Sequence, residues 1–141
     1  MQLDETNVRA MAIGCSILGA GGGGDTDVGV LASLQAIGDF GPVEVVDLDD
    51  LDDDDLIMPC GGIGAPLIWI EKVGRGDEVE RIIPVVERIH GRKVVALMSA
   101  EIGGSNGLAP VAWCARTRLP MRTPISVARS SKARRTKKTM S

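Results

Sequence analysis

Leu18-Gly19-Ala20-Gly21-Gly22-Gly23-Gly24-Asp25 is the stretch that decides the fold class, because five glycines fall within six residues and a carboxylate follows them. Glycine has no Cβ, so this backbone reaches positive φ angles and can approach other groups closely. Two further glycine stretches follow at 61–64 and 103–107, each beside an apolar segment. Together the three stretches predict loops gathered at one edge of an α/β sheet, where a ligand would bind.

Apolar periodicity around these loops predicts four helices and three strands. Asp4 is a suitable N-cap for the first helix, and Pro84 predicts a kink or a later start in the third. The apolar run 67–70 is ambiguous. The order of the elements favours a layered α/β domain with glycine-rich loops at the carboxyl ends of strands. The helices are expected over 5–18, 26–37, 77–89 and 108–116, and the strands over 43–47, 56–59 and 93–98.

The composition fits one globular, cytoplasmic domain. The chain has 141 residues, of which 44% are hydrophobic, so it can form a core. One Phe, two Trp and no Tyr leave little for the aromatic stacking used in nucleic-acid binding. Cys15, Cys60 and Cys114 are widely spaced and His90 is the single histidine, so neither a disulfide framework nor a metal site is predicted. The sequence shows no signal-peptide profile and no apolar run of membrane-spanning length.

Charge divides the chain into two parts. Residues 1–115 hold all 19 acidic residues and 7 of the 16 basic ones, whereas residues 116–141 hold the other 9 basic residues and no acid. The acidic body argues against nucleic acid as its partner. We therefore expect a domain over 1–119 and a basic, disordered tail over 120–141, for which nucleic-acid binding is the usual explanation.

The first glycine stretch also matches the dinucleotide-binding fingerprint, as Gly19-x-Gly21-x-x-Gly24, with Asp47 about 20 residues further on, where a ribose-binding acid belongs. That fingerprint requires a preceding strand, whereas the residues before Gly19 have the pattern of a capped helix. A Rossmann-like dinucleotide-binding module is therefore one alternative. In another, the glycines form a helix C-cap and a loop, and Asp25 caps the next helix.

The third glycine stretch contains more polar side chains suited to catalysis or ligand binding than the other two. A strand runs into Glu101, and Gly103-Gly104 and Ser105-Asn106 follow. A carboxylate, a hydroxyl and an amide thus lie beyond the carboxyl end of a strand, where α/β proteins bind ligands. Cys60, before the second glycine stretch, is a candidate nucleophile with a buried thiol as the alternative, because no histidine accompanies it.

Several short motifs recur in one order along residues 4–119. In that order they resemble the N-terminal domain of the DUF917 family, which includes S-methyl thiohydantoin desulfurase and is associated with hydantoinase and oxoprolinase systems. Family members are considerably longer and carry a second domain, and their pattern stops here after Leu119-Pro120. The motifs are Ile17 to Gly23 with Asp25, Gly64-Ala65-Pro66 with Glu71-Lys72, Gly91-Arg92-Lys93 with Ala96-Leu97-Met98, Glu101 to Gly104, Asn106, and Leu108-Ala109-Pro110.

The resemblance implies a cytosolic enzyme that acts on a small cyclic imide or thiohydantoin ring, with little activity in so short a chain. Removal of an S-methyl group would be hydrolytic, because water adds at the ring carbon and methanethiol leaves. This chemistry needs a base and hydrogen-bond donors. Glu101 is the candidate base or acceptor of a ring N–H, Asn106 the donor to a ring carbonyl, and Asp25 a second acid/base group. The candidate binding residues are Gly21, Gly22, Gly23, Gly24, Gly62, Gly64, Gly103, Gly104, Ser105 and Asn106.

Other partners and classes stay open at this stage. The amides of Gly21–Gly24 would donate to an oxyanion, and no cofactor is indicated. A homo-oligomer or a hydantoinase-type partner is compatible with the resemblance. A non-catalytic interaction domain is the alternative to an enzyme.

The residues beyond Pro120 have a second explanation. Back-translated with GC-rich codons and read two nucleotides out of register, residues 120–130 can spell Asp-Ala-Asp-Ala-Asp-Ile-Gly-Arg-Ala-Phe. That run is similar to the Asp-Ala-Asp…Gly-Arg-Ala-Phe run that follows Leu-Pro in family members. We therefore expect residues from about 120 onward to be out of frame and not packed against the domain.

Overall fold

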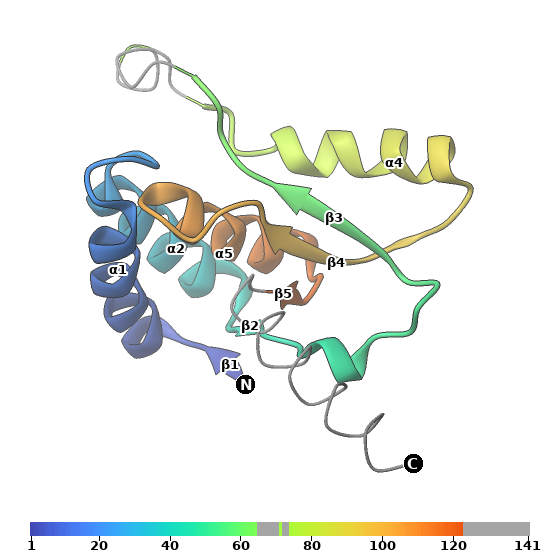
Figure 1. Cartoon of the computed structure of the whole chain (residues 1–141), viewed down its shortest axis with the longest axis horizontal. Coiled ribbons are helices and arrows are strands. Elements are labelled where there is room, and N and C mark those ends of the chain that lie inside the picture. Colours follow the sequence, from blue (N-terminus) through green and yellow to red (C-terminus); the bar gives the residue numbers. More distant parts are fainter. Residues whose placement is uncertain (65–70, 72–73, 123–141) are drawn as a thin grey trace, which may run out of the picture.

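The computed structural model describes residues 1–64, 71 and 74–122 (Figure 1). The predicted α/β class is confirmed, since the described chain combines four α-helices and one short 3-10 helix with a parallel sheet of three strands. The ambiguous run 67–70 lies outside the described residues. The helices are α1 (Glu5–Gly19), α2 (Thr26–Phe40), the short 3-10 helix η1 (Leu48–Asp50), α4 (Glu78–His90) and α5 (Ser105–Thr117). The strands are β1 (Gln2–Leu3), β2 (Val43–Glu44), β3 (Leu56–Cys60), β4 (Val94–Ser99) and β5 (Met121–Arg122).

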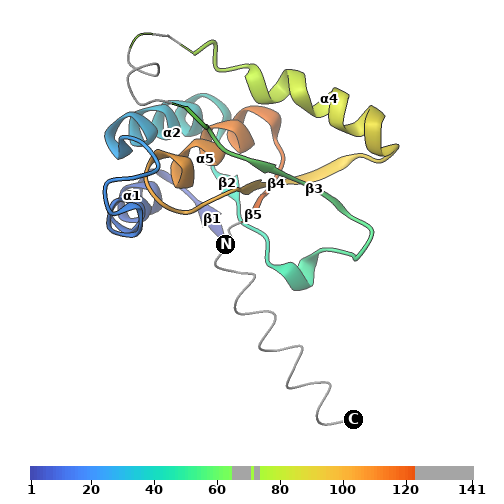
Figure 2. The ribbon, with the colours of Figure 1, turned by 45° about the horizontal axis from the view of Figure 1, so that its top comes forward.

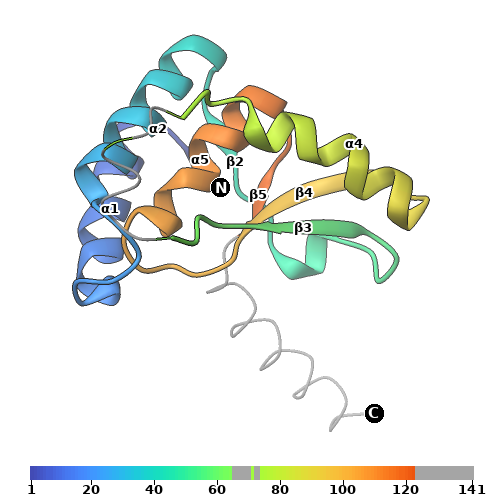
Figure 3. The ribbon, with the colours of Figure 1, turned by 90° about the horizontal axis from the view of Figure 1, so that it is seen from above.

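The main sheet has the strand order β3-β4-β5, and both pairs are parallel. Helices α4 and α5 connect these strands in turn and lie on the same face of the sheet, as right-handed crossovers require (Figures 2 and 3). A second, antiparallel pair is formed by β1 and β2. The two sheets meet where Val45 pairs with Met121, whose carbonyl accepts a hydrogen bond from Val46 N at 3.0 Å.

The core lies between α5, α2 and the sheet. Leu97 of β4 and Leu108 of α5 are fully buried there. Helices α2 and α5 approach closely at Gly29, where a Cβ would lie 3.0 Å from the Cβ of Leu108. The buried Ser33 hydroxyl donates to the carbonyls of Gly29 (2.8 Å) and Leu108 (3.2 Å), so a polar group in the core is satisfied by both helices.

Helix α4 runs without interruption from Glu78 through Pro84 to His90. A later helix start at Pro84 was therefore a wrong expectation. The carboxylate of Asp77, before the helix, makes no capping bond and instead pairs with Arg81 (2.8 Å) and Arg75 (3.3 Å). None of the helices in the described part of the chain is long and apolar enough to cross a membrane.

The expected boundary at residue 119 needs a correction, because Met121 and Arg122 are buried and form β5. The carbonyl of Pro120 accepts a hydrogen bond from Leu97 N at 3.0 Å, which fixes this strand against β4. Within the described residues, the Arg122 side chain makes one hydrogen bond, from Nη1 to the sulfur of Met98 at 3.4 Å, and its Nε and Nη2 have no hydrogen-bond partner. A strand of two residues is too short to show a period, so sequence reasoning missed it. The rest of the expected tail, 123–141, lies outside the described residues.

Candidate functional site

The first and third glycine stretches pack directly against each other. A Cβ on Gly19 would lie 2.7 Å from the backbone nitrogen of Gly104, and one on Gly103 would lie 2.8 Å from the Cα of Gly19. Gly104 also has a positive φ of 63°. Glycine is therefore required at these positions, because the two backbones lie so close together that any side chain would clash.

The first glycine loop caps the N-terminus of α5. The amides of Ser105 and Asn106 donate to the carbonyls of Gly24 (3.2 Å) and Gly23 (3.0 Å), and Gly104 N donates to the carbonyl of Cys15 (2.8 Å). Free amides at a helix N-terminus would attract an anion, but these amides already have acceptors. The proposed oxyanion role of the amides of Gly21–Gly24 stays a prediction.

The dinucleotide fingerprint lacks the structural context that it requires. The residues before its glycines form helix α1, not a strand; Gly19 is the last residue of that helix, and the C-cap Ala20 lies in the left-handed region with a φ of 46°. The Asp25 carboxylate accepts a hydrogen bond from Asp27 N at 2.9 Å and thus caps α2. The geometry agrees with the simpler interpretation, in which the first glycine stretch ends one helix and Asp25 starts the next.

The second and third glycine stretches meet at the carboxyl ends of β3 and β4, which are neighbours in the sheet. Asn106 makes two hydrogen bonds to the peptide groups of Gly62: its Oδ1 accepts from Gly62 N at 2.8 Å, and its Nδ2 donates to Gly62 O at 3.0 Å. The same Nδ2 donates to Oε1 of Glu101. One side chain thus fixes the β3 loop and a carboxylate from the β4 loop.

Ser99, the last residue of β4, holds the backbone of this segment in place through its hydroxyl. Its hydroxyl is fully buried and lies within hydrogen-bonding distance of the carbonyls of Glu101 and Asn106, the latter at 2.9 Å. Sequence reasoning did not select Ser99. The signal that could have found it is a serine that ends a strand of five apolar residues, because a buried hydroxyl needs a partner.

The geometry changes the role of Asn106. Both hydrogens of its amide are used, one by Gly62 O and one by Glu101, so neither is free for a ring carbonyl. Asn106 is therefore placed to orient Glu101. Within the described residues, Oε2 of Glu101 has no hydrogen-bond partner, and the side chain is exposed. This oxygen is free to accept a proton or a ligand N–H.

The remaining candidate residues lie around this point in different ways. Ser105 faces α2, since a Cβ on Gly29 would lie 3.0 Å from its hydroxyl. Gly64 is exposed, at the end of the described β3 loop. The structure thus brings Gly62, Glu101 and Asn106 together, while Ser105 and the first glycine loop support the back of the site. A shallow cavity of about 330 Å³ lies elsewhere, at the amino end of β4, and is lined by Pro84, Glu87, Arg88, Gly91, Arg92 and Lys93.

The three cysteines are free and buried. Burial raises the pKa of the Cys60 thiol to about 11. Burial, with the nearby Cys60 thiol, also raises the pKa of Cys114, and burial alone raises that of Cys15. A thiol that stays protonated at neutral pH is a poor nucleophile, so Cys60 fits the buried-thiol alternative. In the described ranges, no three His, Cys, Asp or Glu side chains are grouped to hold a metal ion.

Comparisons with known proteins agree with this fold. A family model described as "S-Me-THD-like, N-terminal domain" matches residues 6–122. The X-ray structure of a protein from Chromobacterium violaceum superposes with a TM-score of 0.64 at 22% sequence identity and covers 86% of this chain. The match spans 34% of that longer protein, about a third of its length. No curated protein matches the sequence.

Proposed function

Because the chain belongs to the family of S-Me-THD-like N-terminal domains, we propose that it is the N-terminal part of a cytoplasmic hydrolase that acts on a hydantoin-like ring. The observation that carries this proposal is the Glu101 carboxylate, which Asn106 holds beside Gly62 at the carboxyl ends of two parallel strands. Ligands of open α/β sheets bind at this edge. The three free thiols fit a reducing compartment.

Glu101 supplies the proton chemistry in this proposal. Its free Oε2 takes a proton from water as the water oxygen bonds to the ring carbon that carries the S-methyl group. The carbon–sulfur bond then breaks, and the leaving thiolate takes this proton from Glu101 to become methanethiol. The proton of the added hydroxyl passes to the ring nitrogen as the ring carbon becomes a carbonyl, so water and the methylthio ring give the oxo ring and methanethiol without an oxidant. Asn106 keeps the carboxylate pointed at the edge of the sheet.

We propose that the remaining part of the site comes from the region that longer relatives add. The described edge offers one free carboxylate oxygen and two glycine loops, which is enough to bind a ring but leaves few donors for the developing charge. Activity of this chain alone is therefore expected to be weak, and binding is the better measurement.

Ligand-induced thermal shifts test the proposal. An S-methyl thiohydantoin or a hydantoin should raise the melting temperature of the chain, since a ligand that binds the folded state stabilises it. Glu101→Gln should abolish the shift, because a carboxamide is a weaker acceptor of a ring N–H. Glu44→Gln is the matched control, because Glu44 is exposed on β2, away from the site. A shift with NAD alone would refute the proposal in favour of a dinucleotide module. The absence of any shift would favour the non-catalytic interaction domain.

A further inference from the structure

Within the described residues, every polar group of Asn106 has a partner. Its side chain bonds to the peptide groups of Gly62 and to Glu101. Its backbone amide donates to the carbonyl of Gly23 at 3.0 Å, and its own carbonyl lies 2.9 Å from the hydroxyl oxygen of Ser99. The side chain that orients Glu101 is therefore attached to a backbone that other segments hold on both sides.

The carbonyl of Asn106 lacks the partner that an α-helix normally supplies. Asn106 is the second residue of α5, and in an α-helix each carbonyl accepts a hydrogen bond from the N–H four positions later. That position is Pro110, whose ring nitrogen carries no hydrogen. A carbonyl that is removed from water and has no donor costs free energy. Pro110 thus leaves this carbonyl to a donor from outside the helix, and the hydroxyl of Ser99 lies within hydrogen-bonding distance of it.

The sheet places Ser99 at this point. Ser99 is the last residue of β4, its register partner is Cys60 of β3, and its side chain is fully buried. The amide of Ala100 donates to the carbonyl of Cys60 at 2.9 Å, so the two strands stay joined just beyond Ser99. The hydroxyl has one hydrogen, which the carbonyls of Glu101 and Asn106 share. Ser99 therefore contacts the backbone of the candidate base and of the residue that orients it.

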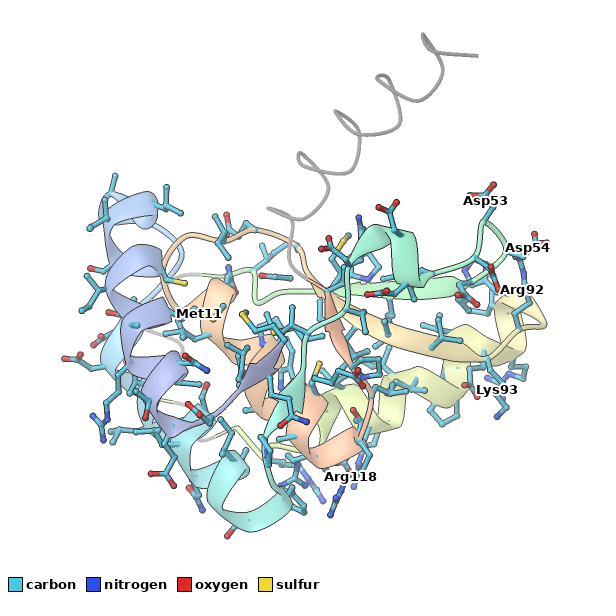
Figure 4. The ribbon with its side chains drawn as sticks, turned by 90° about the horizontal axis from the view of Figure 1, so that it is seen from below. Met11, Asp53, Asp54, Arg92, Lys93 and Arg118 are labelled. Carbon is cyan, nitrogen blue, oxygen red and sulfur yellow. The ribbon has the colours of Figure 1, made fainter. Side chains whose placement is uncertain are left out.

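The Glu101 carboxylate is held by a hydrogen bond and not by an ion pair. Among the described residues, Glu101 forms no salt bridge. The basic side chains of Arg92 and Lys93 lie at the amino end of β4, the opposite end of the strand from Glu101 (Figure 4). The direction of the carboxylate therefore depends on the hydrogen bond from Asn106.

We propose that Ser99 is a positioning residue for Glu101, and that Pro110 makes this role necessary. Pro110 offers no helical donor to the carbonyl of Asn106, and the hydroxyl of Ser99 replaces that donor. The backbone of Asn106 is thereby fixed to the end of β4, and its side chain keeps the free oxygen of Glu101 directed at the edge of the sheet. A base must lie within hydrogen-bonding reach of the proton that it takes. This inference rests on the proposed function, because it assigns Ser99 and Pro110 to the same site.

A buried serine can also stabilise a fold without serving a site, and Ser33 is the matched control for that explanation. Ser33 is fully buried too, and its hydroxyl likewise contacts two carbonyls, those of Gly29 and Leu108. Ser33→Ala and Ser99→Ala thus remove the same chemical group from equally buried positions. A difference between the two variants at Asn106 reports positioning, and not a general loss of stability.

NMR of the isotope-labelled full chain follows the side-chain amide of Asn106 directly. The chain has two asparagines, so the side-chain amide of Asn7 is an internal reference. Ser99→Ala should speed hydrogen exchange of the Asn106 side-chain amide by about three- to tenfold, the effect of losing one supporting hydrogen bond. Ser33→Ala should leave this rate unchanged. Equal effects of the two serine variants on Asn106 would overturn the proposal.

Pro110→Ala tests why Ser99 is needed. It supplies the missing N–H, which can donate to the carbonyl of Asn106 within the helix. In that background, Ser99→Ala should speed the exchange less than it does in the parent chain, because the carbonyl keeps a donor. Equal effects in both backgrounds would refute the role of Pro110. If circular dichroism shows that Ser99→Ala does not fold, Ser99→Cys replaces it in both backgrounds, since a thiol is a weaker donor.

Thermal shifts with an S-methyl thiohydantoin separate this inference from the proposed function. When the parent chain responds, Ser99→Ala should reduce the shift, Pro110→Ala combined with it should restore the shift, and Ser33→Ala should keep it. A shift that Ser99→Ala leaves intact would overturn the positioning role and leave the proposed function standing. A parent chain without a shift would count against the proposed function, whereas the exchange rates would still show whether Ser99 and Pro110 fix Asn106.

Discussion

Asn106→Ala removes the side-chain hydrogen bonds that join the β3 loop to the amino end of α5 and to Glu101, as far as the structure describes the chain. Two of these bonds hold the peptide groups of Gly62 (2.8 and 3.0 Å), in a part-buried position, and one holds Glu101. Each bond to Gly62 contributes about 0.5–1.5 kcal/mol, so the two together contribute about 2 kcal/mol. The bond to Glu101 adds little to stability, because this carboxylate is exposed.

The assay is urea unfolding followed by circular dichroism. The expected loss of about 2 kcal/mol corresponds to a melting temperature lower by about 8 °C for a domain of this size. Asn7→Ala is the matched control, because Asn7 makes a single exposed side-chain bond, from Nδ2 to Gln2 O at 3.0 Å. Asn7→Ala is expected to lower the free energy of unfolding by about 0.5 kcal/mol. Equal losses in the two variants would refute the argument that Asn106 joins the two loops.

Three further perturbations have expected outcomes. Gly103→Ala should destabilise the fold by about 2–3 kcal/mol, because its Cβ would lie 2.8 Å from the Cα of Gly19. Gly38→Ala is the matched control: the space around Gly38 is open, so this change should stabilise α2 by about 0.5–1 kcal/mol. Urea titration would measure both changes. Cys60 should resist alkylation at pH 8 in the native state and react once urea unfolds the chain, because its pKa is raised to about 11; mass spectrometry of quenched samples would reveal a reactive thiol if this is wrong. Arg122→Met should stabilise the fold by about 1–3 kcal/mol, since it removes a buried guanidinium, two of whose nitrogens have no hydrogen-bond partner in the described part of the chain. A lower urea midpoint would contradict that reason.

The regular elements were predictable from local patterns. The helix expected over 5–18 is α1, and Asp4 caps it through hydrogen bonds from Thr6 N and Asn7 N at 2.9 Å. The strand expected over 93–98 is β4. Such patterns depend on residues that lie within a few positions of one another, so the sequence carries them directly. The expected strand 43–47 shortened to Val43–Glu44, because its partner β1 has two residues.

The contacts within the candidate site could not be predicted from local sequence patterns. Sequence alone placed Glu101 and Asn106 after a strand, with glycines before and beside them, and so predicted that they lie at the carboxyl edge of the sheet. It assigned Asn106 to the ligand, whereas the structure gives its amide to Gly62, 44 residues away, and to Glu101. Hydrogen bonds between distant segments leave no spacing in the sequence from which they could be read.

The sequence by itself therefore determined the α/β class, the helices and main strands, and the edge where polar residues gather. Each of these depends on apolar spacing, capping residues and glycine positions, which can be read within a few residues of one another. The tertiary structure alone decided that the glycine stretches contact each other, that Met121 and Arg122 complete the sheet, and that Ile82, Val85 and Ile89 of α4 stay exposed. Each of these depends on which surfaces meet once the chain is packed. Close approach and burial are properties of pairs of segments, and no single segment records them.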